Sequence, residues 1–363
     1  MHIPLRLLLV FTAVGTAFSQ DKPTMDFEKY DPVSTLVVPE HKITRAKFPF
    51  IDVHNHQWNM LTQDLGALQR QMDELNMTVM VNLSGRSGAV LQKTAERLKS
   101  EAPNRLVLFA NIEFEGFGRE GWIENAVRQL ESDVRAGARG LKFFESFGLN
   151  VKDHEGRRVA VDDSRMDPIW VKCAELKIPV LIHSGSPKSF WDPVDEHNER
   201  WLELVLRPNR RRTATYPAPY EQVMGEQRNL FKKHSGTTFI AAHFAWQANN
   251  LALLGTWLEE TPNMFIELGA VVAELGRQPR AAKAFFTKYQ DRILFGKDSW
   301  VPEEYQTYFR VLETEDEYFP YHKKYHAFWA MYGMGLSDDV LKKIYYKNAL
   351  RVIPGLDASL FPQ

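Results

Sequence analysis

The sequence has a single cysteine, Cys173, almost no net charge, and no long hydrophobic run after its first twenty residues. A single cysteine excludes an intramolecular disulfide, so the fold depends on its hydrophobic core. The 45 Lys and Arg residues balance 46 Asp and Glu residues, which leaves a formal net charge of -1. Because a general nucleic-acid binder needs a broad positive field, we predict no nucleic-acid partner.

The first twenty residues have the composition of a secretory signal peptide. Arg6 precedes an apolar run from Leu7 to Phe18, and small residues stand at Ala17 and Ser19. The run is shorter than the roughly 20 residues that a membrane-spanning helix needs. We expect residues 1–19 to be cleaved after Ser19, which makes the protein exported (periplasmic or secreted) with no stable membrane insertion afterwards.

Short β-rich apolar runs alternate with helical patterns from Phe48 onward. The strand candidates cover residues 48–53, 78–83, 106–112, 140–144, 179–183, 238–243, 264–268 and 293–296. Between them, apolar side chains recur at three- and four-residue spacing, as in helices that cover a sheet. Eight such units predict an α/β fold, a single (β/α)8 TIM barrel over residues 48–363 that follows a polar arm over residues 20–47.

Two of the predicted connections are unusually long: residues 184–220 after the fifth strand and residues 299–336 after the eighth. Both follow a strand and therefore lie at the carboxyl-end face, where barrel enzymes have their active sites. Their aromatic and charged residues favour loops that enclose a substrate. The arginine-rich run at 207–212 is predicted as a basic patch on the surface.

His54 and His56 at the end of the first strand give the strongest functional signal. The run FPFIDVHNH alternates, so both imidazoles point to one face, about 7 Å apart along the strand. At the carboxyl end of a barrel strand that face is the barrel mouth, where two neutral imidazoles can bind one cation. The alternative is a pair of histidines that only form hydrogen bonds.

Further polar residues stand at the ends of other predicted strands. His183 ends the fifth strand, His243 the sixth and Asp298 the eighth, while Lys142 lies on the fourth. Barrel closure brings these ends into one ring and places three histidines and a carboxylate within reach of a single metal. Such a set favours Zn²⁺, and Mn²⁺ and Fe²⁺ accept the same ligands.

These residues, in this order, resemble the amidohydrolase superfamily. More narrowly, the chain resembles the amidohydrolase-2 group of metal-dependent TIM-barrel hydrolases and decarboxylases. The stretches that carry the resemblance are IDVHNH, GARGLKFF, IPVLIH, FIAAH, ILFGKD and YKNALRVIP, which together extend over residues 50–354. Each stretch alone is weak, but the ordered set is specific.

The resemblance implies four metal ligands: His54, His56, His183 and Asp298. It makes His243 either an acid/base residue that polarises an oxygen or a ligand to a second metal. Lys142 matches the carboxylated lysine that bridges two metals in some members of the superfamily. We expect one metal ion rather than two, with Lys142 contacting the substrate or a neighbouring carboxylate.

The eighth strand departs from the group in one position. Relatives usually read Gly-Thr-Asp or Gly-Ser-Asp here, whereas this chain reads Gly296-Lys297-Asp298. Because side chains alternate along a strand, Lys297 is expected to point away from Asp298 and leave it free as a ligand.

The ligand set predicts a metal-activated water that hydrolyses an amide, ester or lactone bond. Asp298 is expected to act as the base that takes the water proton, and His243 to stabilise the oxyanion. The resemblance also allows a non-oxidative decarboxylase of a small carboxylic acid. A third hypothesis is a non-catalytic metal-binding barrel. Barrels of this group often pair, so the partners implied are a small-molecule substrate and a second copy in a homodimer.

Four more residues are candidate substrate contacts: Trp191, His197, Arg200 and Glu267. Trp191, His197 and Arg200 belong to the first long loop, whose aromatic and polar groups suit a sugar-like or aromatic acid substrate. The alternative is that its aromatic side chains only pack on the barrel. Glu267 ends the seventh strand, where a hydrogen bond to a metal ligand and a structural ion pair are the alternatives.

Overall fold

The computed structural model describes residues 24–213 and 215–362, so the predicted signal peptide lies outside the described residues. The chain divides into two units, residues 1–36 and residues 37–363. The described part of the first unit contains a short 3-10 helix, Phe27–Lys29. Residues 37–47, predicted as part of the arm, belong to the second unit, because the backbone N–H groups of His41 and Lys47 donate to Asp316 and Glu313.

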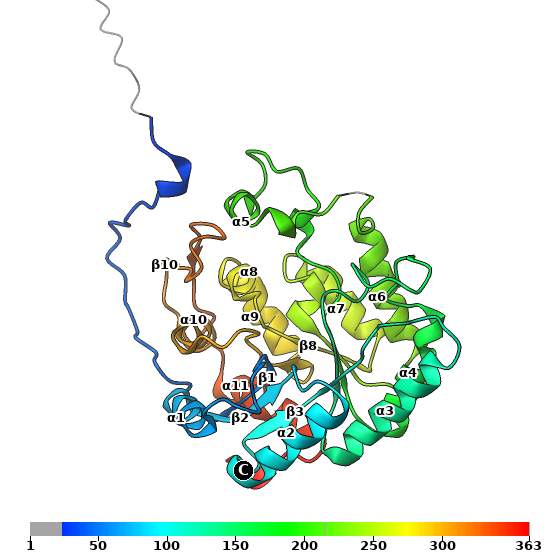
Figure 1. Ribbon diagram of the computed structural model, residues 1–363. Helices are drawn as coiled ribbons and strands as arrows, with labels where there is room; N and C mark the ends of the chain where they lie inside the picture. Colours follow the sequence, from blue (N-terminus) through cyan, green and yellow to red (C-terminus); the bar gives the residue numbers. More distant parts are fainter. Residues whose placement is uncertain (1–23, 214, 363) are drawn as a thin grey trace, which may run out of the picture. The chain divides into compact units, whose positions relative to one another are not determined.

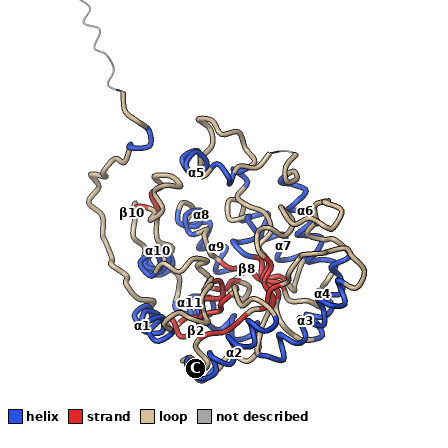
Figure 2. Tube along the Cα trace, viewed as in Figure 1, coloured by secondary structure: helices blue, strands red, loops and turns tan. Residues whose placement is uncertain are grey.

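Short parallel strands form the centre of the second unit (Figures 1 and 2). In chain order they are β1 (Phe50–Asn55), β2 (Met77–Asn82), β3 (Leu106–Leu108), β4 (Ala110–Asn111), β5 (Leu141–Phe143), β6 (Val180–Ile182), β7 (Phe239–Ala241), β8 (Met264–Glu267) and β9 (Ile293–Leu294). They lie where the alternating pattern predicts strands. All six residues of β1 are buried, as expected for a strand covered on both faces.

The third predicted strand is present as two pieces that meet at Phe109. The strand ladders accordingly form two sheets, β1-β2-β3 and β4 to β9. Backbone hydrogen bonds continue across the break, from Phe109 N to Asn82 O and from Ala110 N to Gly140 O. A Cβ on Gly140 would stand 2.4 Å from the Phe109 ring, so this ring requires the glycine beside it.

Two backbone hydrogen bonds join the last strand to the first. Val53 N donates to Phe295 O at 3.0 Å, and Asp298 N donates to His54 O at 2.6 Å. Asn55 and Asp298 also form a parallel bridge. The chain therefore has the strand order of a TIM barrel, in which the carboxyl ends of β1 and β9 are neighbours.

Helices surround the strands (Figure 2). They are α1 (Leu65–Leu75), α2 (Gly88–Glu101), α3 (Trp122–Ala136), α4 (Asp167–Glu175), α5 (Trp201–Leu206), α6 (Tyr220–Lys233), α7 (Leu251–Glu260), α8 (Val272–Gly276), α9 (Pro279–Lys288), α10 (Pro302–Glu313), α11 (Asp338–Lys342) and α12 (Asn348–Val352). Helix α1 shows why they form. The Asp64 carboxylate accepts from Ala67 N at 2.9 Å to cap the first turn, and Asn76 ends the helix in a left-handed conformation.

The segment 299–336 is not the long loop that the sequence predicted, because it contains helix α10. Tyr305, Tyr308, Phe309 and Leu312 are buried at helical spacing. Three of these four side chains are aromatic, and two carry hydroxyls, so the apolar face was less evident in the sequence. Helix α10 packs against α1 and α8 and completes the outer layer.

A π-helical turn, Lys343–Lys347, joins α11 to α12 within one continuous helical stretch. This turn lies against β9 and β1. Its Ile344 carbonyl accepts a hydrogen bond from Phe295 N at 3.0 Å, so the turn fixes the end of the last strand. Local π-helical turns of this kind often occur beside functional sites.

Two segments stand over the carboxyl-end face, and we call them the roof (Figure 1). The first, residues 184–219, contains the 3-10 helices Lys188–Phe190 and Pro208–Arg210 with α5 between them. The second, residues 314–331, contains the antiparallel pair of β10 (Phe319–Pro320) and β11 (Ala330–Met331). The roof is therefore built largely from short, folded pieces rather than from open loops.

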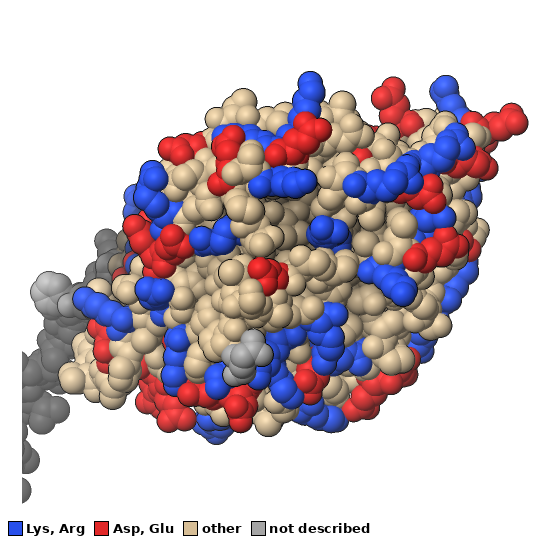
Figure 3. Space-filling model, turned by 90° about the horizontal axis from the view of Figure 1, so that it is seen from below, with Lys and Arg blue, Asp and Glu red and all other residues tan. Residues whose placement is uncertain are grey.

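On the face seen in Figure 3, Lys and Arg side chains are interspersed with Asp and Glu. Within the described ranges, no helix is long and apolar enough to cross a membrane.

Candidate metal centre

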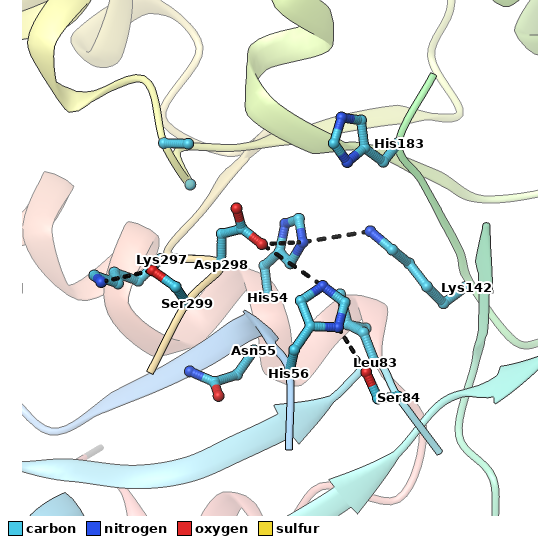
Figure 4. A network of polar contacts seen from close by, with 12 residues as sticks. His54, Asn55, His56, Leu83, Ser84, Lys142, His183, Lys297, Asp298 and Ser299 are labelled. Atoms are coloured by element: carbon cyan, nitrogen blue, oxygen red, sulfur yellow. Dashed lines mark hydrogen bonds and ion pairs between the residues drawn. The ribbon is translucent and has the colours of Figure 1, made fainter. Parts of the chain in front are cut away.

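Three potential metal ligands meet where β1 and β9 end (Figure 4). The Nε2 atoms of His54 and His56 lie 3.4 and 3.6 Å from Oδ1 of Asp298. Alternation along β1 places both rings on one side, and the backbone bond from Asp298 N to His54 O holds the third ligand beside them. The structure thus brings together three of the four ligands that the sequence predicted.

The donor set fits a divalent metal. Two ligand atoms about 2.1 Å from a tetrahedral Zn²⁺ stand about 3.4 Å apart, close to the distances found here. Burial lowers the pKa of His54 well below its ordinary value and that of His56 to about 4, with the positive charge of Lys142 as the second cause. Both imidazoles are therefore neutral at pH 7, which is the form that binds metal.

Hydrogen bonds on the other ring nitrogens fix how the two histidines point. Glu267 Oε1 lies 2.8 Å from Nδ1 of His54, and Ser84 Oγ lies 2.8 Å from Nδ1 of His56. Because a carboxylate only accepts, Nδ1 of His54 carries the proton and its Nε2 presents a lone pair. Glu267 is thus the residue that prepares His54 to bind a metal.

His183 and His243 face each other beside this group. Nδ1 of His243 donates to the Gly269 carbonyl at 2.7 Å, so the neutral ring has a bare Nε2. That atom lies 3.2 Å from Nδ1 of His183, which must then be the donor. Nε2 of His183 is left bare and, within the described part of the chain, without a hydrogen-bond partner. It stands apart from the three grouped ligands but is free to bind a metal or a substrate.

His243 begins a strained stretch of backbone. Four consecutive residues, His243 to Trp246, have φ between 53° and 56°, in the left-handed region that residues other than glycine rarely adopt. Glu267 Oε1 accepts from His243 N at 2.7 Å and Glu267 Oε2 from Gly269 N at 2.7 Å. The same carboxylate therefore orients His54 and holds the turn that presents His243.

Lys142 on β5 points into the same site. Its Nζ lies 3.3 Å from Nε2 of His54, and the side chain is buried. Burial lowers the pKa of Lys142 to about 8, against the opposing effect of Asp298 and Glu267. The amine therefore contacts a proposed metal ligand and does not extend into the open part of the site.

Asp298 is ionised and reaches the open side of the site. Burial acts to raise its pKa, but the nearby His54, His243 and His56, together with Lys142, outweigh burial and lower the pKa to about 2. Its side chain remains 37% exposed. A carboxylate that is both charged and accessible can bind a metal and accept a proton.

Asp52 links the two strand ends that carry the ligands. Its Oδ1 accepts from His54 N at 3.0 Å and from Lys297 N at 3.2 Å, and its Oδ2 accepts from Tyr305 OH at 2.6 Å. Burial raises the pKa of this carboxyl to about 6. Asp52 was not among the predicted site residues, although an aspartate inside an apolar strand was a visible signal.

Lys297 points away from Asp298, as strand alternation predicted (Figure 4). Its Nζ donates to Ser299 Oγ at 3.0 Å and forms an ion pair with Glu304 on α10. The unusual Gly-Lys-Asp sequence therefore fastens the ligand-bearing turn to α10 without entering the site.

A cavity of about 210 Å³ opens beside Asp298, His183 and His243. Its other walls come from both roof segments and from the turn after β5. The remaining lining residues are Glu145, Ser186, Pro187, Phe190, Arg200, Glu203, Arg210, Trp246, Ala270, Lys323, Tyr325 and His326. A partly open cavity of this size suits a small molecule.

Two predicted substrate contacts do not line this cavity. Trp191 donates through Nε1 to the Ala218 carbonyl at 2.8 Å and packs on Tyr220, so it holds the loop together. His197 is 85% exposed on the outer side of the loop. Both belong to the segment that covers the site, but neither is placed to contact a substrate in the cavity.

Of the other two candidates, Glu267 hydrogen-bonds a metal ligand, which was one of its alternatives, and Arg200 lies on the cavity wall. Glu267 is fully buried, and both of its oxygens accept hydrogen bonds within the barrel, so it cannot reach a substrate. Arg200 lines the cavity, where its two Nη atoms are paired with Glu203 and Glu274, while its Nε has no hydrogen-bond partner within the described ranges. Its guanidinium lies 5.2 Å from the Trp329 ring. Arg200 therefore joins the two roof segments and α8.

The arginine run at 207–212 is only partly the surface patch that was predicted. Arg210 lines the cavity and pairs with Glu203. Arg212 is largely buried and lies 3.0 Å from Glu145. Lys323 and His326, which also line the cavity, lie in the segment treated as an uninterrupted loop, where no strand end marked them.

The fold and the grouped ligands define a class: a TIM barrel with an HxH pair on its first strand and an aspartate after its last. The chain belongs to the amidohydrolase family, whose model (Amidohydro_2, described as amidohydrolase) matches residues 51–355. This family is enzymatic and metal-dependent. The expectation of an amidohydrolase-type barrel is thereby confirmed.

Solved structures show the same fold. An uncharacterized TIM-barrel protein from Bordetella bronchiseptica has a TM-score of 0.53 at 15% identity, over 84% of this chain and 97% of that chain. The 4-oxalomesaconate hydratase from Rhodopseudomonas palustris has a TM-score of 0.51 at 15% identity, over 86% of this chain and 97% of that chain. Among curated proteins, no sequence match was found.

Proposed function

We propose that this protein is a metal-dependent hydrolase that cleaves an amide, ester or lactone bond in a small substrate. The observation that carries the proposal is the grouping of His54, His56 and Asp298 within 3.6 Å at the mouth of the barrel, beside a small cavity. The metal-dependence of the family supports the same interpretation.

The proposed ligands are His54, His56 and Asp298, with the bare Nε2 of His183 as the fourth. We propose Zn²⁺ as the metal, because two or three imidazoles and a carboxylate are its usual set. A single ion is favoured because the second group of donors, His54 with His243 and Glu267, is already occupied by hydrogen bonds. Lys142 contacts His54 and does not bridge two donor groups.

A bound metal supplies a water of lowered pKa and polarises the substrate oxygen. Side chains of the protein would carry out the other steps of the reaction. Asp298 is ionised, so it accepts the proton of the attacking water and returns it to the leaving group. His243 uses its N–H on the Gly269 carbonyl and its bare Nε2 on His183, so in this arrangement it orients His183 and does not donate to the developing oxyanion. The roof limits access of water to the cavity and restricts the size of the substrate.

Asp298→Asn tests this proposal. The variant should keep its fold but lose at least a hundredfold in kcat on an ester and lactone library, because a positioned base contributes about 10²–10⁴. Asp291→Asn is the matched control, since Asp291 precedes the same strand at its other end and pairs with Lys343 on the surface. Circular dichroism and turnover would be measured on both variants.

Near-normal turnover of Asp298→Asn would remove the proton-transfer role from Asp298. Release of CO₂ from small carboxylic acids, without hydrolysis of any ester, amide or lactone, would replace the hydrolase proposal with a decarboxylase. Export of the enzyme through residues 1–19 stays a prediction from the sequence, and so does a homodimer.

A further inference from the structure

One wall of the cavity carries two basic side chains that lack a full set of hydrogen-bond partners among the described residues. Lys323 and His326 belong to the second roof segment and are joined by a turn, in which His326 N donates to Lys323 O at 2.9 Å. Both side chains line the same cavity as Asp298, His183 and His243. The turn therefore presents an ammonium and an imidazole to the same space.

His326 is buried without a full set of partners. Its side chain is 9% exposed and packs between Tyr321 and Tyr325. Nδ1 lies 3.5 Å from Tyr321 OH, whereas Nε2 has no hydrogen-bond partner in the described ranges and stands 3.5 Å from Glu203 Oε1. A buried polar atom that lacks a partner is costly, which indicates that a bound group supplies the partner.

The Lys323 ammonium also lacks a close hydrogen-bond partner in the described part of the chain. Its side chain is 16% exposed, and its Nζ lies 3.8 Å from Glu304 Oε2. At that distance the two groups attract each other but form no hydrogen bond. Glu304 is also shared with Lys297 and His322, so its charge is already balanced.

The carboxylates on the same cavity do not compete for these donors. Glu203 binds Arg200 through one oxygen and Arg210 through the other. Glu145 binds Arg212 and accepts from Ser186 Oγ at 2.6 Å. Each of these acids is already paired with an arginine. Among the described residues, the cavity nitrogens that lack a hydrogen-bonded acceptor therefore include Lys323 Nζ and His326 Nε2, beside Arg200 Nε and Trp246 Nε1.

We propose that Lys323 and His326 form a binding subsite for a carboxylate of the substrate, on the cavity wall away from the reacting bond. The inference rests on the proposed function, and it narrows the substrate to a small carboxylic acid that also carries the scissile bond. A carboxylate satisfies both donors, and a charge-assisted hydrogen bond to Lys323 is about twice as strong as a neutral one.

Succinate is the probe for this subsite, with its uncharged diamide succinamide as the control ligand. Binding to the full chain would be measured by calorimetry, both metal-loaded and after the metal has been removed, so that coordination of succinate to the metal is separated from the roof. We expect wild-type protein to bind succinate in both forms and to bind succinamide at least tenfold more weakly.

The variants identify the residues that bind succinate. Lys323→Met should weaken succinate binding at least tenfold, His326→Phe about fivefold, and Lys323→Arg about twofold at most, because arginine keeps the charge. Lys324→Met is the matched control and removes the same charge one position along; it should change binding less than twofold. Metal content and the melting temperature should stay at wild-type values in all of them.

Three results would overturn the subsite: no succinate binding by wild type, equal weakening by Lys324→Met, or loss of binding in Lys323→Met only in proportion to loss of metal. Failure of the hydrolase proposal is distinguishable from these. Succinate binding that depends on Lys323 without any hydrolysis would keep the subsite and reject the reaction, whereas hydrolysis unaffected by Lys323→Met would do the reverse.

Discussion

The buried carboxylate of Glu267 orients residues of the metal centre without itself facing the cavity. It fixes the protonated nitrogen of His54, accepts from the backbone of His243, and accepts from Gly269. An amide in its place would still accept with one oxygen, but its NH₂ group would face a donor. The tautomer of His54 with an unprotonated Nε2 would then no longer be fixed.

We therefore expect Glu267→Gln to weaken metal binding by about 10- to 100-fold, the usual effect of losing a partner that orients a metal ligand. Competition with a chelator of known affinity would measure this. Glu260→Gln on the surface of α7 is the control for the lost charge and should leave metal affinity unchanged. Unaltered affinity in Glu267→Gln would show that His54 is held in place by other contacts.

The left-handed turn from His243 to Trp246 is the second feature at this scale. Ala245, at φ 53°, bears the strain that a side chain suffers in this conformation, about 1–2 kcal/mol. Glycine adopts the same conformation freely, so Ala245→Gly should be neutral or slightly stabilising. Ala282→Gly within α9, where glycine costs about 0.5–1 kcal/mol before the lost packing is counted, should lower stability.

Denaturant unfolding of both variants checks this prediction. The account requires the free energy of unfolding of Ala245→Gly to exceed that of Ala282→Gly by about 1 kcal/mol or more. Equal losses in the two variants would mean that the turn is not strained.

At the scale of the elements, the roof is held by a buried ion-pair network rather than by apolar packing alone. Arg200 pairs with Glu203 in its own segment and with Glu274 on α8, and Trp329 lies between Arg200 and Arg277 at 5.2 and 3.9 Å. The guanidinium of Arg200 thus contacts residues of both roof segments, which are far apart in sequence. Removing it would leave two buried carboxylates less well paired, which is costly.

Arg200→Ala should lower the free energy of unfolding by roughly 3–5 kcal/mol, the loss expected when one partner of a buried ion pair is removed. His197→Ala, three residues earlier on the exposed side of the loop, should change it by less than about 0.5 kcal/mol. Chemical denaturation measures both values. A small effect for Arg200→Ala would return this residue to the role of substrate contact that the sequence suggested.

The strands and most helices could be predicted from the sequence, because period-two and period-3.6 patterns depend on local burial. Helix α10 could not be recognised, since tyrosines form much of its buried face. Trp191 and His197 were misassigned as substrate contacts for another reason. Whether Trp191, His197 or Arg200 faces the cavity depends on how two insertions meet, and no local pattern records that contact.

At the scale of the whole molecule, barrel closure assembles the site. His54 and Asp298 are far apart in sequence, yet one backbone hydrogen bond joins them. The ordering of polar residues at strand ends therefore allowed His54, His56 and Asp298 to be predicted as neighbours. The position of His183 could not be predicted as well, because its orientation is set by its hydrogen bond to His243 rather than by the strand.

The measurement that tests the account most directly is metal content per chain, by elemental analysis of the purified wild type beside Lys142→Ala and His54→Ala. The account predicts about one divalent ion in the wild type and in Lys142→Ala, and none in His54→Ala. Two ions in the wild type that fall to one in Lys142→Ala would contradict the single-ion site. A wild-type protein that takes up no divalent metal under any loading condition would contradict the metal centre itself.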